Sequence, residues 1–465
     1  MRAVIGLEIH VHMLSKSKLF CSCPTDYEGK EPNTLVCPIC LGFPGSKPKV
    51  NKKVIENAIL AARALNCKIN PEIFFSRKSY FYPDMAKNYQ ISQYEIPLAE
   101  NGYLEISSKK IRIKRIHIEE DPAKLIHVGG DITTSQYVLI DYNRAGIPLL
   151  EIVTEPDFSN TKEVREFLFK LSSILAHLEI FNPSKEASLR VDANISLDGG
   201  ARTEIKNITG FANVQKALDY EIVRQANLIR LGQKVERETR HFDEERRVTV
   251  SLRKKEFEED YGYIFDPDLT KIEITQKWIK SISMPELPDA RVKRLIKKYG
   301  IPAEQANIIV YTDKALADFF ENCAKIYADR KKLARWIVTD LLKCLNWNKI
   351  TIRESKVKPK DFVQLLKMID RKVISEALAK EIIKEYVPTG KSPAKIVKER
   401  KLVMIKDRRI LEKIVKEILE KNKKAVADYR AGKEKALEFL VGQVLMKMEK
   451  RVDPKIVREI IKSLI

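Results

Sequence analysis

In the stretch VIGLEIHVHM, residues 4–13, apolar and polar side chains alternate from Leu7 onward. Successive side chains of a β-strand point to opposite faces of a sheet. The alternation therefore gives the segment a polar and an apolar face, Glu8, His10 and His12 against Leu7, Ile9 and Val11. A carboxylate beside two imidazoles is an unusual choice for a solvated sheet surface. The segment predicts a half-buried strand whose polar face carries chemistry.

Four further segments repeat this pattern of one apolar and one polar side: RIKRIHIEEDPAK (112–124), IPLLEIVTEPD (147–157), SLRVDANIS (188–196) and RTEIKN (202–207). If all five join one sheet, its polar face carries Glu8, His10, Glu119 or Glu120, Glu151, Asp192 and Glu204. The two-residue repeat of a strand places Glu119 on the same side as His117 and Glu120 on the opposite side. It does not decide which of the two glutamates binds a metal. The competing interpretation is a set of scattered surface acids on unrelated strands.

So many carboxylates on one face repel one another unless cations compensate them. Hard divalent cations, Mg²⁺ above all, bind carboxylates and often bring phosphates with them. Basic residues near the same segments, among them Lys78, Arg190 and Lys206, can balance such phosphates. The pattern favours phosphoryl transfer by positioning and charge neutralisation. The sequence contains neither of two common nucleotide-binding motifs, GxxxxGK[ST] and a GxGxxG after a strand. Any ATP must therefore be bound by a metal-rich site on the sheet.

Four of the seven cysteines are clustered as CSC and CPIC, at Cys21, Cys23, Cys37 and Cys40. Two thiolate pairs across a short connection suit tetrahedral Zn²⁺. A redox CxxC is the weaker interpretation, because the CPIC pair is accompanied by a second pair. We expect a structural zinc that braces a loop rather than one that catalyses.

The chain has 465 residues and a formal net charge of +21. Residues 341–465 hold 33 Lys and Arg against 17 Asp and Glu, a net of +16, so the basic excess lies in the C-terminal quarter. This asymmetry indicates either a polyanion partner, most plausibly RNA, or a solvated Lys-rich helical surface. With neither a signal peptide nor an apolar run long enough to span a membrane, the protein is expected to be cytoplasmic.

Strand signals fade after about residue 286, where a helical region begins with Pro at its boundary. A second boundary is expected near PTGKSPAKIVKERKLV, residues 388–403, which carries Pro, Gly and Ser. We therefore predict an α+β protein with a mixed-sheet domain over residues 1–285, an all-α domain over 286–398 and a small helical tail over 399–465.

Eight motifs run in order over nearly the whole chain: VIGLEIHV, PNTLVCPICLGFPG, RKSYFYPDMAKNYQISQY, IHIEEDPAKLIH, DYNRAGIPLLEIVTEPD, SLRVDANIS, EIKNITGF and DYRAGKEKALEFLVGQVLMK. This ordered set resembles the B subunit of the aspartyl/glutamyl-tRNA(Asn/Gln) amidotransferase. The resemblance implies a glutamine synthetase-like cradle, a helical domain, and a YqeY-like tail that contacts tRNA. It also implies that the side-chain carboxylate of misacylated Glu-tRNA(Gln) or Asp-tRNA(Asn) is phosphorylated by ATP and then amidated.

The resemblance also implies roles for single residues. Magnesium would be held by Glu8, His10, Glu119 or Glu120, Glu151 and Glu204, which are the expected catalytic set. ATP or substrate would be contacted by Arg77, Lys78, Tyr80, Tyr82, Lys87, Gln90, Ser92, Arg190, Asp192 and Lys206. The tail would contact tRNA through Arg430, Lys433, Lys435 and Lys447. Ammonia would come from an amidase-type A subunit that hydrolyses glutamine, with a small C subunit clasping the two.

Three alternatives are weighed against this assignment. KNITGF stands where the family more often has KNLNSF, which moves the chain towards the archaeal-type E subunit that serves only Glu-tRNA(Gln). That subunit carries an extra inserted domain, for which residues 260–300 leave no space. A non-catalytic zinc-containing RNA-binding protein would have no need of Glu151 in an apolar strand, since a buried charge is costly without compensation. A free-standing ligase for a small carboxylate leaves the basic tail without a purpose.

Overall fold

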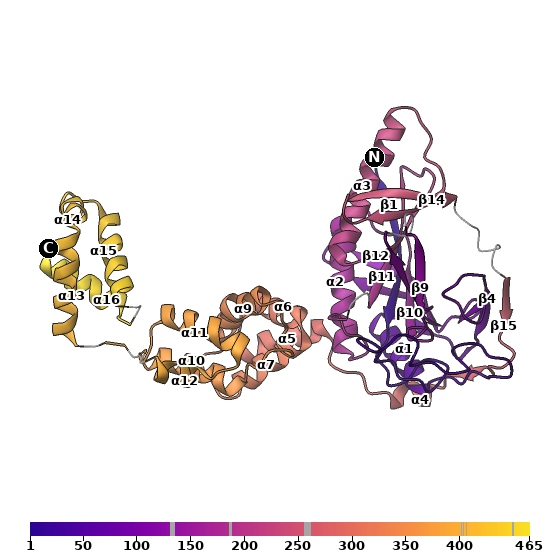
Figure 1. Cartoon of the computed structure of the whole chain (residues 1–465), viewed down its shortest axis with the longest axis horizontal. Helices are drawn as coiled ribbons and strands as arrows, with labels where there is room; N and C mark the ends of the chain where they lie inside the picture. The colour runs from indigo at the N-terminus through magenta and orange to yellow at the C-terminus, as the bar shows by residue number, and fades with distance from the viewer. Residues whose placement is uncertain are drawn as a thin grey trace. The chain divides into compact units, whose positions relative to one another are not determined.

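The computed structural model describes residues 1–130, 135–185, 188–254, 262–400, 402, 404–405, 407–448 and 451–465. They divide into two compact units, Met1–Pro288 and Asp289–Ile465. All described strands belong to the first unit, and the second is helical (Figure 1). The predicted mixed sheet followed by helices is thus confirmed, whereas the boundaries at 285 and 398 stay predictions. Within the described ranges, every helix is too short or too polar to cross a lipid bilayer.

A nine-stranded sheet forms the frame of the first unit. Its order from edge to edge is β14 (Val248–Lys254), β13 (Glu238–Asp243), β12 (Thr203–Thr209), β11 (Leu189–Leu197), β1 (Ala3–His12), β10 (Pro148–Thr154), β7 (Lys110–Glu120), β6 (Ala99–Glu105) and β2 (Lys68–Ile69). Neighbours are antiparallel except β12 and β13, which are parallel. The five segments of alternating pattern are therefore adjacent members of one sheet, as predicted.

One face of this sheet is buried under three helices, α1 (Lys52–Ala64), α2 (Thr161–His177) and α3 (Phe211–Arg230). Leu7, Ile9 and Val11 of β1 point into this core and are at most 1% exposed. The Asn160 side chain caps α2 by accepting a hydrogen bond from the Glu163 N–H at 3.0 Å. Figure 1 shows α2 and α3 running along the sheet. Burial of this face leaves the opposite, polar face for the site.

Shorter elements surround the polar face. A three-stranded sheet joins β15 (Gly262–Phe265), β4 (Ser76–Ser79) and β5 (Tyr89–Ser92), and two-stranded sheets join β16 (Ile272–Glu273) to β3 (Glu72–Ile73) and β8 (Lys124–Val128) to β9 (Tyr137–Asp141). The unit closes with α4 (Gln276–Ser281). Through β4, β5 and β15, residues distant in sequence from the main strands line the site.

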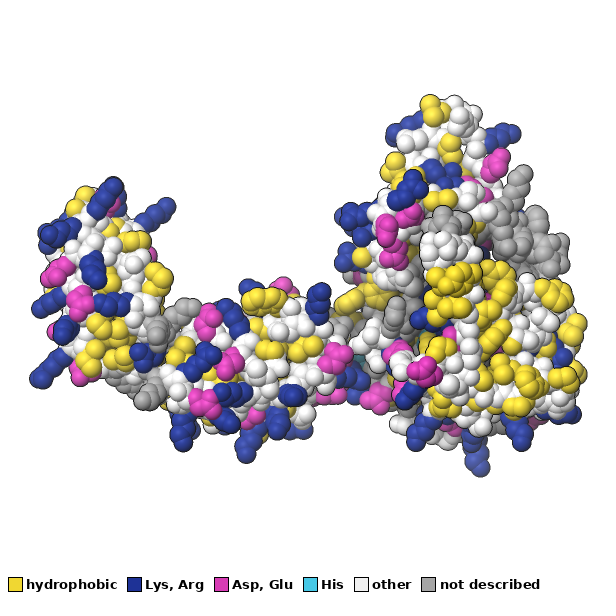
Figure 2. Space-filling view, viewed as in Figure 1, with side chains coloured by type: hydrophobic (Ala, Val, Ile, Leu, Met, Phe, Trp, Pro, Cys, Tyr) yellow, Lys and Arg dark blue, Asp and Glu magenta, His cyan; other side chains and the backbone are white. Residues whose placement is uncertain are grey.

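The second unit contains two separate hydrophobic cores. The first is built by α5 (Pro288–Tyr299), α6 (Ala303–Thr312), α7 (Lys314–Ala324), α8 (Arg330–Trp336), the π-helix η2 (Ile337–Leu341), α9 (Leu342–Trp347), α10 (Pro359–Asp370), α11 (Glu376–Thr389) and α12 (Pro393–Glu399). The second belongs to the tail helices α13 (Arg408–Lys421), α14 (Lys423–Arg430), α15 (Glu434–Lys447) and α16 (Pro454–Leu464). Figure 2 shows many Lys and Arg side chains on the surfaces of these helices.

Candidate functional site

Three side chains from the centre of the sheet form a first group of potential metal ligands, His10 of β1, Glu119 of β7 and Glu151 of β10. One donor atom from each lies within 4.8 Å of the other two. Strand pairing sets this geometry, because His10 stands opposite Glu151 in the antiparallel register. His10 Nε2 lies 3.6 Å from Glu119 Oε1, and His117 Nδ1 lies 3.3 Å from Glu151 Oε2.

A second group lies on the neighbouring strands and consists of Glu8, Asp192 and Glu204, again with donor atoms within 4.8 Å of one another. Glu8 of β1 stands directly opposite Asp192 of β11. The Asn194 side chain donates to Glu8 Oε1 at 3.1 Å. Lys206 Nζ lies 3.5 Å from Asp192 Oδ2 and 4.0 Å from Glu204 Oε1, so one ammonium offsets part of the negative charge.

The electrostatics of the two groups follow from burial and crowding. The pKa of Glu8 is raised above its ordinary value, first by burial and then by the nearby Glu151, Asp192 and Glu204. Burial and Glu151 likewise raise the pKa of Glu119. The pKa of Glu151 is lowered although burial opposes ionisation, because His117 hydrogen-bonds to it. A bound divalent cation would relieve this repulsion.

Both groups open into one cavity of about 690 Å³ within the first unit. Its carboxylates include Glu8, Glu119, Glu151 and Glu204, and its basic lining consists of Lys78, Lys114, Arg115, Arg202, Lys206 and Arg237. Tyr94 and Tyr263 also line it and stack on each other with ring centroids 4.0 Å apart. This volume suits a small-molecule ligand, and the lining places cations beside the acidic groups.

Some residues predicted to contact ATP or substrate lie in this cavity and others do not. Lys78, Ser92 and Lys206 line it, and the Ser92 hydroxyl donates to Glu119 Oε2 at 3.1 Å. Asp192 belongs to the second acidic group, a membership that the face pattern had already indicated. Tyr80 is half-buried, and Tyr82 is exposed.

The remaining predicted contacts are engaged elsewhere. The Arg77 guanidinium binds Asp266 at 2.8 Å and Asp268 at 3.1 Å. Glu120 is outside both acidic groups, since its carboxylate accepts hydrogen bonds from Lys87 and from the Ile91 N–H. The Gln90 side chain donates to the Glu120 carbonyl at 2.8 Å. The alternation of β7 thus continues to its end, with Glu119 facing the cavity and Glu120 facing the loop that follows β4.

Asp121 is the centre of a buried ionic network that the sequence pattern did not reveal. His12 Nε2 lies 2.7 Å from its carboxylate, and Arg190 and Arg144 lie 2.5 Å and 3.2 Å away. Burial opposes ionisation of Asp121, but Arg190, then Arg144 and the His12 hydrogen bond, lower its pKa. Arg190, predicted to bind substrate, therefore has a structural partner already. The sequence signal for Asp121 was weak, because this residue lies just beyond the alternating part of β7.

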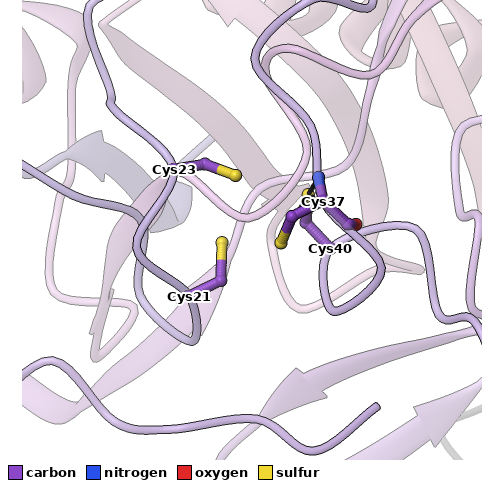
Figure 3. Close-up of side chains that lie close together, drawn as sticks. All are labelled: Cys21, Cys23, Cys37 and Cys40. Atoms are coloured by element: carbon purple, nitrogen blue, oxygen red, sulfur yellow. Dashed lines mark hydrogen bonds between the residues drawn. The ribbon is translucent and has the colours of Figure 1, made fainter. Parts of the chain in front are cut away.

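The four clustered cysteines converge at one point (Figure 3). Their sulfur atoms lie within 4.8 Å of one another, and Cys37 and Cys40 are 3.9 Å apart at sulfur. Four thiolates around Zn²⁺ at the usual bond length of about 2.3 Å sit nearly 4 Å from one another. The pKa of Cys40 is lowered to about 5, first because the Cys21 thiol hydrogen-bonds to it. The donor set fits a structural zinc ion.

The tail helices carry a basic cavity of about 540 Å³ at the start of α14 and α15. Its lysines are Lys421, Lys423, Lys424, Lys433 and Lys435, and the half-exposed Phe439 lies beside them. Two of them were predicted to bind tRNA. Of the other two predicted contacts, Arg430 Nη2 lies 3.5 Å from the Ile465 carbonyl and Lys447 pairs with Glu417. The run KNKK at 421–424 was the signal for the missed lysines.

The fold and the site define a multidomain enzyme, with a carboxylate-lined cavity in its sheet domain and basic helical domains after it in the chain. Residues 3–280 match the family model of the GatB/GatE catalytic domain, and residues 318–465 match that of the GatB domain. The chain therefore belongs to the family of aspartyl/glutamyl-tRNA(Asn/Gln) amidotransferase B subunits.

Three relatives that are named as B subunits of this amidotransferase support the assignment. The chain is 50% identical to that of Sulfolobus acidocaldarius, over 99% of this chain and 98% of the relative. It is 49% identical to that of Saccharolobus solfataricus with the same coverage. It is 45% identical to that of Carboxydothermus hydrogenoformans, again over 99% of this chain and 98% of the relative. Similarity thus extends from the sheet domain to the end of the tail.

Proposed function

We propose that this chain uses ATP to activate the side-chain carboxylate of misacylated Glu-tRNA(Gln), Asp-tRNA(Asn) or both, and then amidates it. The observation that carries the proposal is the pair of acidic groups in one cavity with Lys and Arg around them. Such a site can hold divalent cations, polyphosphate and a carboxylate substrate together. Family membership supports the same substrate class, because the relatives are named for tRNA(Asn/Gln).

The proposed reaction has two steps. A side-chain carboxylate oxygen attacks the γ-phosphorus of ATP, and the bond to the β-γ bridging oxygen breaks to release ADP. Ammonia then attacks the carbonyl carbon of the acyl phosphate, the carbon–oxygen bond to phosphate breaks, and the amide and inorganic phosphate leave. The nitrogen loses protons as the amide forms. Activation is needed because an ionised carboxylate is a poor electrophile.

The donor sets fit Mg²⁺, which favours carboxylate oxygens and keeps several waters. His10, Glu119 and Glu151 would hold one ion, and Glu8, Asp192 and Glu204 would hold another. When bound, Mg²⁺ supplies charge neutralisation and a fixed arrangement of phosphate oxygens. Ser92 orients Glu119 by donating a hydrogen bond to it. Lys78, Lys206 and Arg237 line the cavity, where their charges suit the phosphates.

Ammonia would come from a partner subunit, and tRNA would bind to the tail. We propose a glutamine-hydrolysing A subunit and a small C subunit as partners, since a lettered subunit name implies an assembly of several chains. Exposed apolar side chains on the β8–β9 hairpin, Ile126, Tyr137, Val138 and Leu139, provide surface of the kind that partners cover. The lysines of the tail cavity, with Arg430 and Lys447, would contact the tRNA backbone.

Further parts of the proposal concern the metal loop, the fold and the cell compartment. Zinc would bind Cys21, Cys23, Cys37 and Cys40 and brace the loop over residues 21–40. The sheet domain would share the cradle of glutamine synthetase, and the protein would act in the cytoplasm. The three relatives, 98% of whose length this chain covers, favour the B type over the archaeal-type E subunit.

The test is ATP hydrolysis by the chain assembled with its A and C partners, measured with Mg²⁺ and misacylated tRNA. Glu151→Gln removes one ligand of the first group, and Glu236→Gln is the matched control at an exposed position. We expect tRNA-dependent hydrolysis to fall at least 100-fold in the first variant and to stay within twofold in the control. Equal rates in all three proteins, with tRNA still bound, would overturn the proposal.

A further inference from the structure

Lys18 is a completely buried lysine beside the cysteine cluster, with 0% of its surface exposed. Its ammonium group donates to the Leu35 carbonyl at 2.9 Å, the Tyr142 carbonyl at 3.4 Å and the Cys40 sulfur at 3.7 Å. In the described part of the chain, no carboxylate pairs with it. A buried ammonium without a counter-charge is strongly unfavourable, so an anion is expected beside Lys18.

The cysteine cluster supplies its full negative charge only when it holds a metal. Four thiolates on one Zn²⁺ leave two net negative charges in a largely buried site, whereas the metal-free cluster carries at most the single thiolate of Cys40. We propose that Lys18 is the counter-charge of the zinc site: its ammonium hydrogen-bonds to the Cys40 sulfur and offsets the negative charge left by the four thiolates. The inference rests on the zinc part of the proposed function.

The surroundings hold Lys18 in this position. Its backbone N–H donates to the Cys23 carbonyl at 2.9 Å, which ties it to the other half of the cluster. Gly146, at a φ of +86°, packs so closely that a Cβ there would stand 3.3 Å from Lys18 Cδ. The side chain thus passes close to Gly146 and ends at Cys40 and the two carbonyls.

Through these contacts Lys18 connects the zinc loop to the wall of the active-site domain. The Tyr142 carbonyl belongs to the turn that precedes β10, and Asn143 in the same turn accepts a hydrogen bond from the Leu35 N–H at 2.7 Å. Arg144 follows and contacts Asp121. Lys18 is thus a positioning residue, which acts through the metal loop and not on substrate.

The test compares the full chain with Lys18→Met, and with Lys16→Met as a control at an exposed lysine two residues away. Zinc affinity is measured by competition with a chromophoric chelator. We expect wild type to bind one zinc ion, Lys18→Met to bind it 10- to 100-fold more weakly, and Lys16→Met to match wild type. Unchanged affinity in Lys18→Met would overturn the inference.

Two readouts separate the counter-charge from a simple packing role. Without metal, Lys18→Met should melt at nearly the wild-type temperature, because the ammonium there faces at most the Cys40 thiolate, while with zinc it should melt clearly lower. With Co²⁺ in the site, the thiolate-to-cobalt band should move to longer wavelength in Lys18→Met, because the sulfur loses a stabilising positive charge. Equal destabilisation with and without zinc, or an unmoved band, would overturn the inference. If wild type bound no zinc, the proposed zinc site and the role of Lys18 would both be wrong. The proposed ATP-dependent reaction would still be tested separately by ATP hydrolysis.

Discussion

Glu8→Gln removes one charge from the second acidic group without changing the shape of the side chain. Glutamine keeps an oxygen for the hydrogen bond that Glu8 Oε1 accepts from Asn194 at 3.1 Å. Donor atoms of Asp192 and Glu204 lie within 4.8 Å of that of Glu8. At an effective dielectric constant of about 20, two unit charges at this distance repel by roughly 3 kcal/mol. Lys206 and hydration offset part of this, so we expect a net relief of about 1–3 kcal/mol.

The variant should therefore be more stable than wild type in the absence of divalent cations and less responsive to them. Differential scanning calorimetry in EDTA should show the transition of the sheet domain about 2–6 °C higher, at about 2 °C per kcal/mol for a unit of this size. Added Mg²⁺ should raise the wild-type transition, because it binds only the folded site, and should raise the variant less.

A matched control tests whether the removal of any negative charge has the same effect. Glu236→Gln removes one negative charge at an exposed position outside both acidic groups. It should shift neither the EDTA transition nor the Mg²⁺ response. If Glu8→Gln instead lowers the EDTA transition, or keeps the full Mg²⁺ response, the acidic group is not a repulsive cation site and the reasoning fails.

Two further predictions follow from the pKa shifts and from the tail. Because the pKa values of Glu8 and Glu119 are raised above 4.5, the folded protein takes up protons there before the unfolded chain does. The metal-free sheet domain should then gain stability as the pH falls from neutral towards 4.5, and Mg²⁺ should bind more weakly, as calorimetry in both conditions would show. In the tail, Lys424→Ala with Lys435→Ala should weaken tRNA binding and lower the slope of log affinity against log salt by about one to two, in filter-binding assays. An unchanged slope would show that these two lysines do not contact the tRNA backbone.

The sequence predicted the strands and their faces because those depend on local alternation. β1, β7, β10, β11 and β12 all carry an apolar side that needs a core. Their spatial order, and the parallel pairing of β12 with β13, depend on contacts distant in the chain and were not predicted.

The same division holds for the candidate site. The alternation of β7 placed Glu119 with His117, yet only the three-dimensional structure shows that Lys87 engages Glu120 instead. The cysteine spacing predicted the cluster, since a short loop brings such pairs together. Lys18 gave no signal, because nothing in its neighbours along the chain shows that it is buried.

The central claim is that the substrate carboxylate is activated by phosphorylation in this cavity. The most direct measurement uses Glu-tRNA(Gln) or Asp-tRNA(Asn) labelled with ¹⁸O in the side-chain carboxylate, with the chain assembled with its partners, ATP, Mg²⁺ and glutamine. The account predicts that one labelled oxygen appears in inorganic phosphate for each amide formed, and that Glu151→Gln forms neither product. Amidated tRNA with unlabelled phosphate would contradict it.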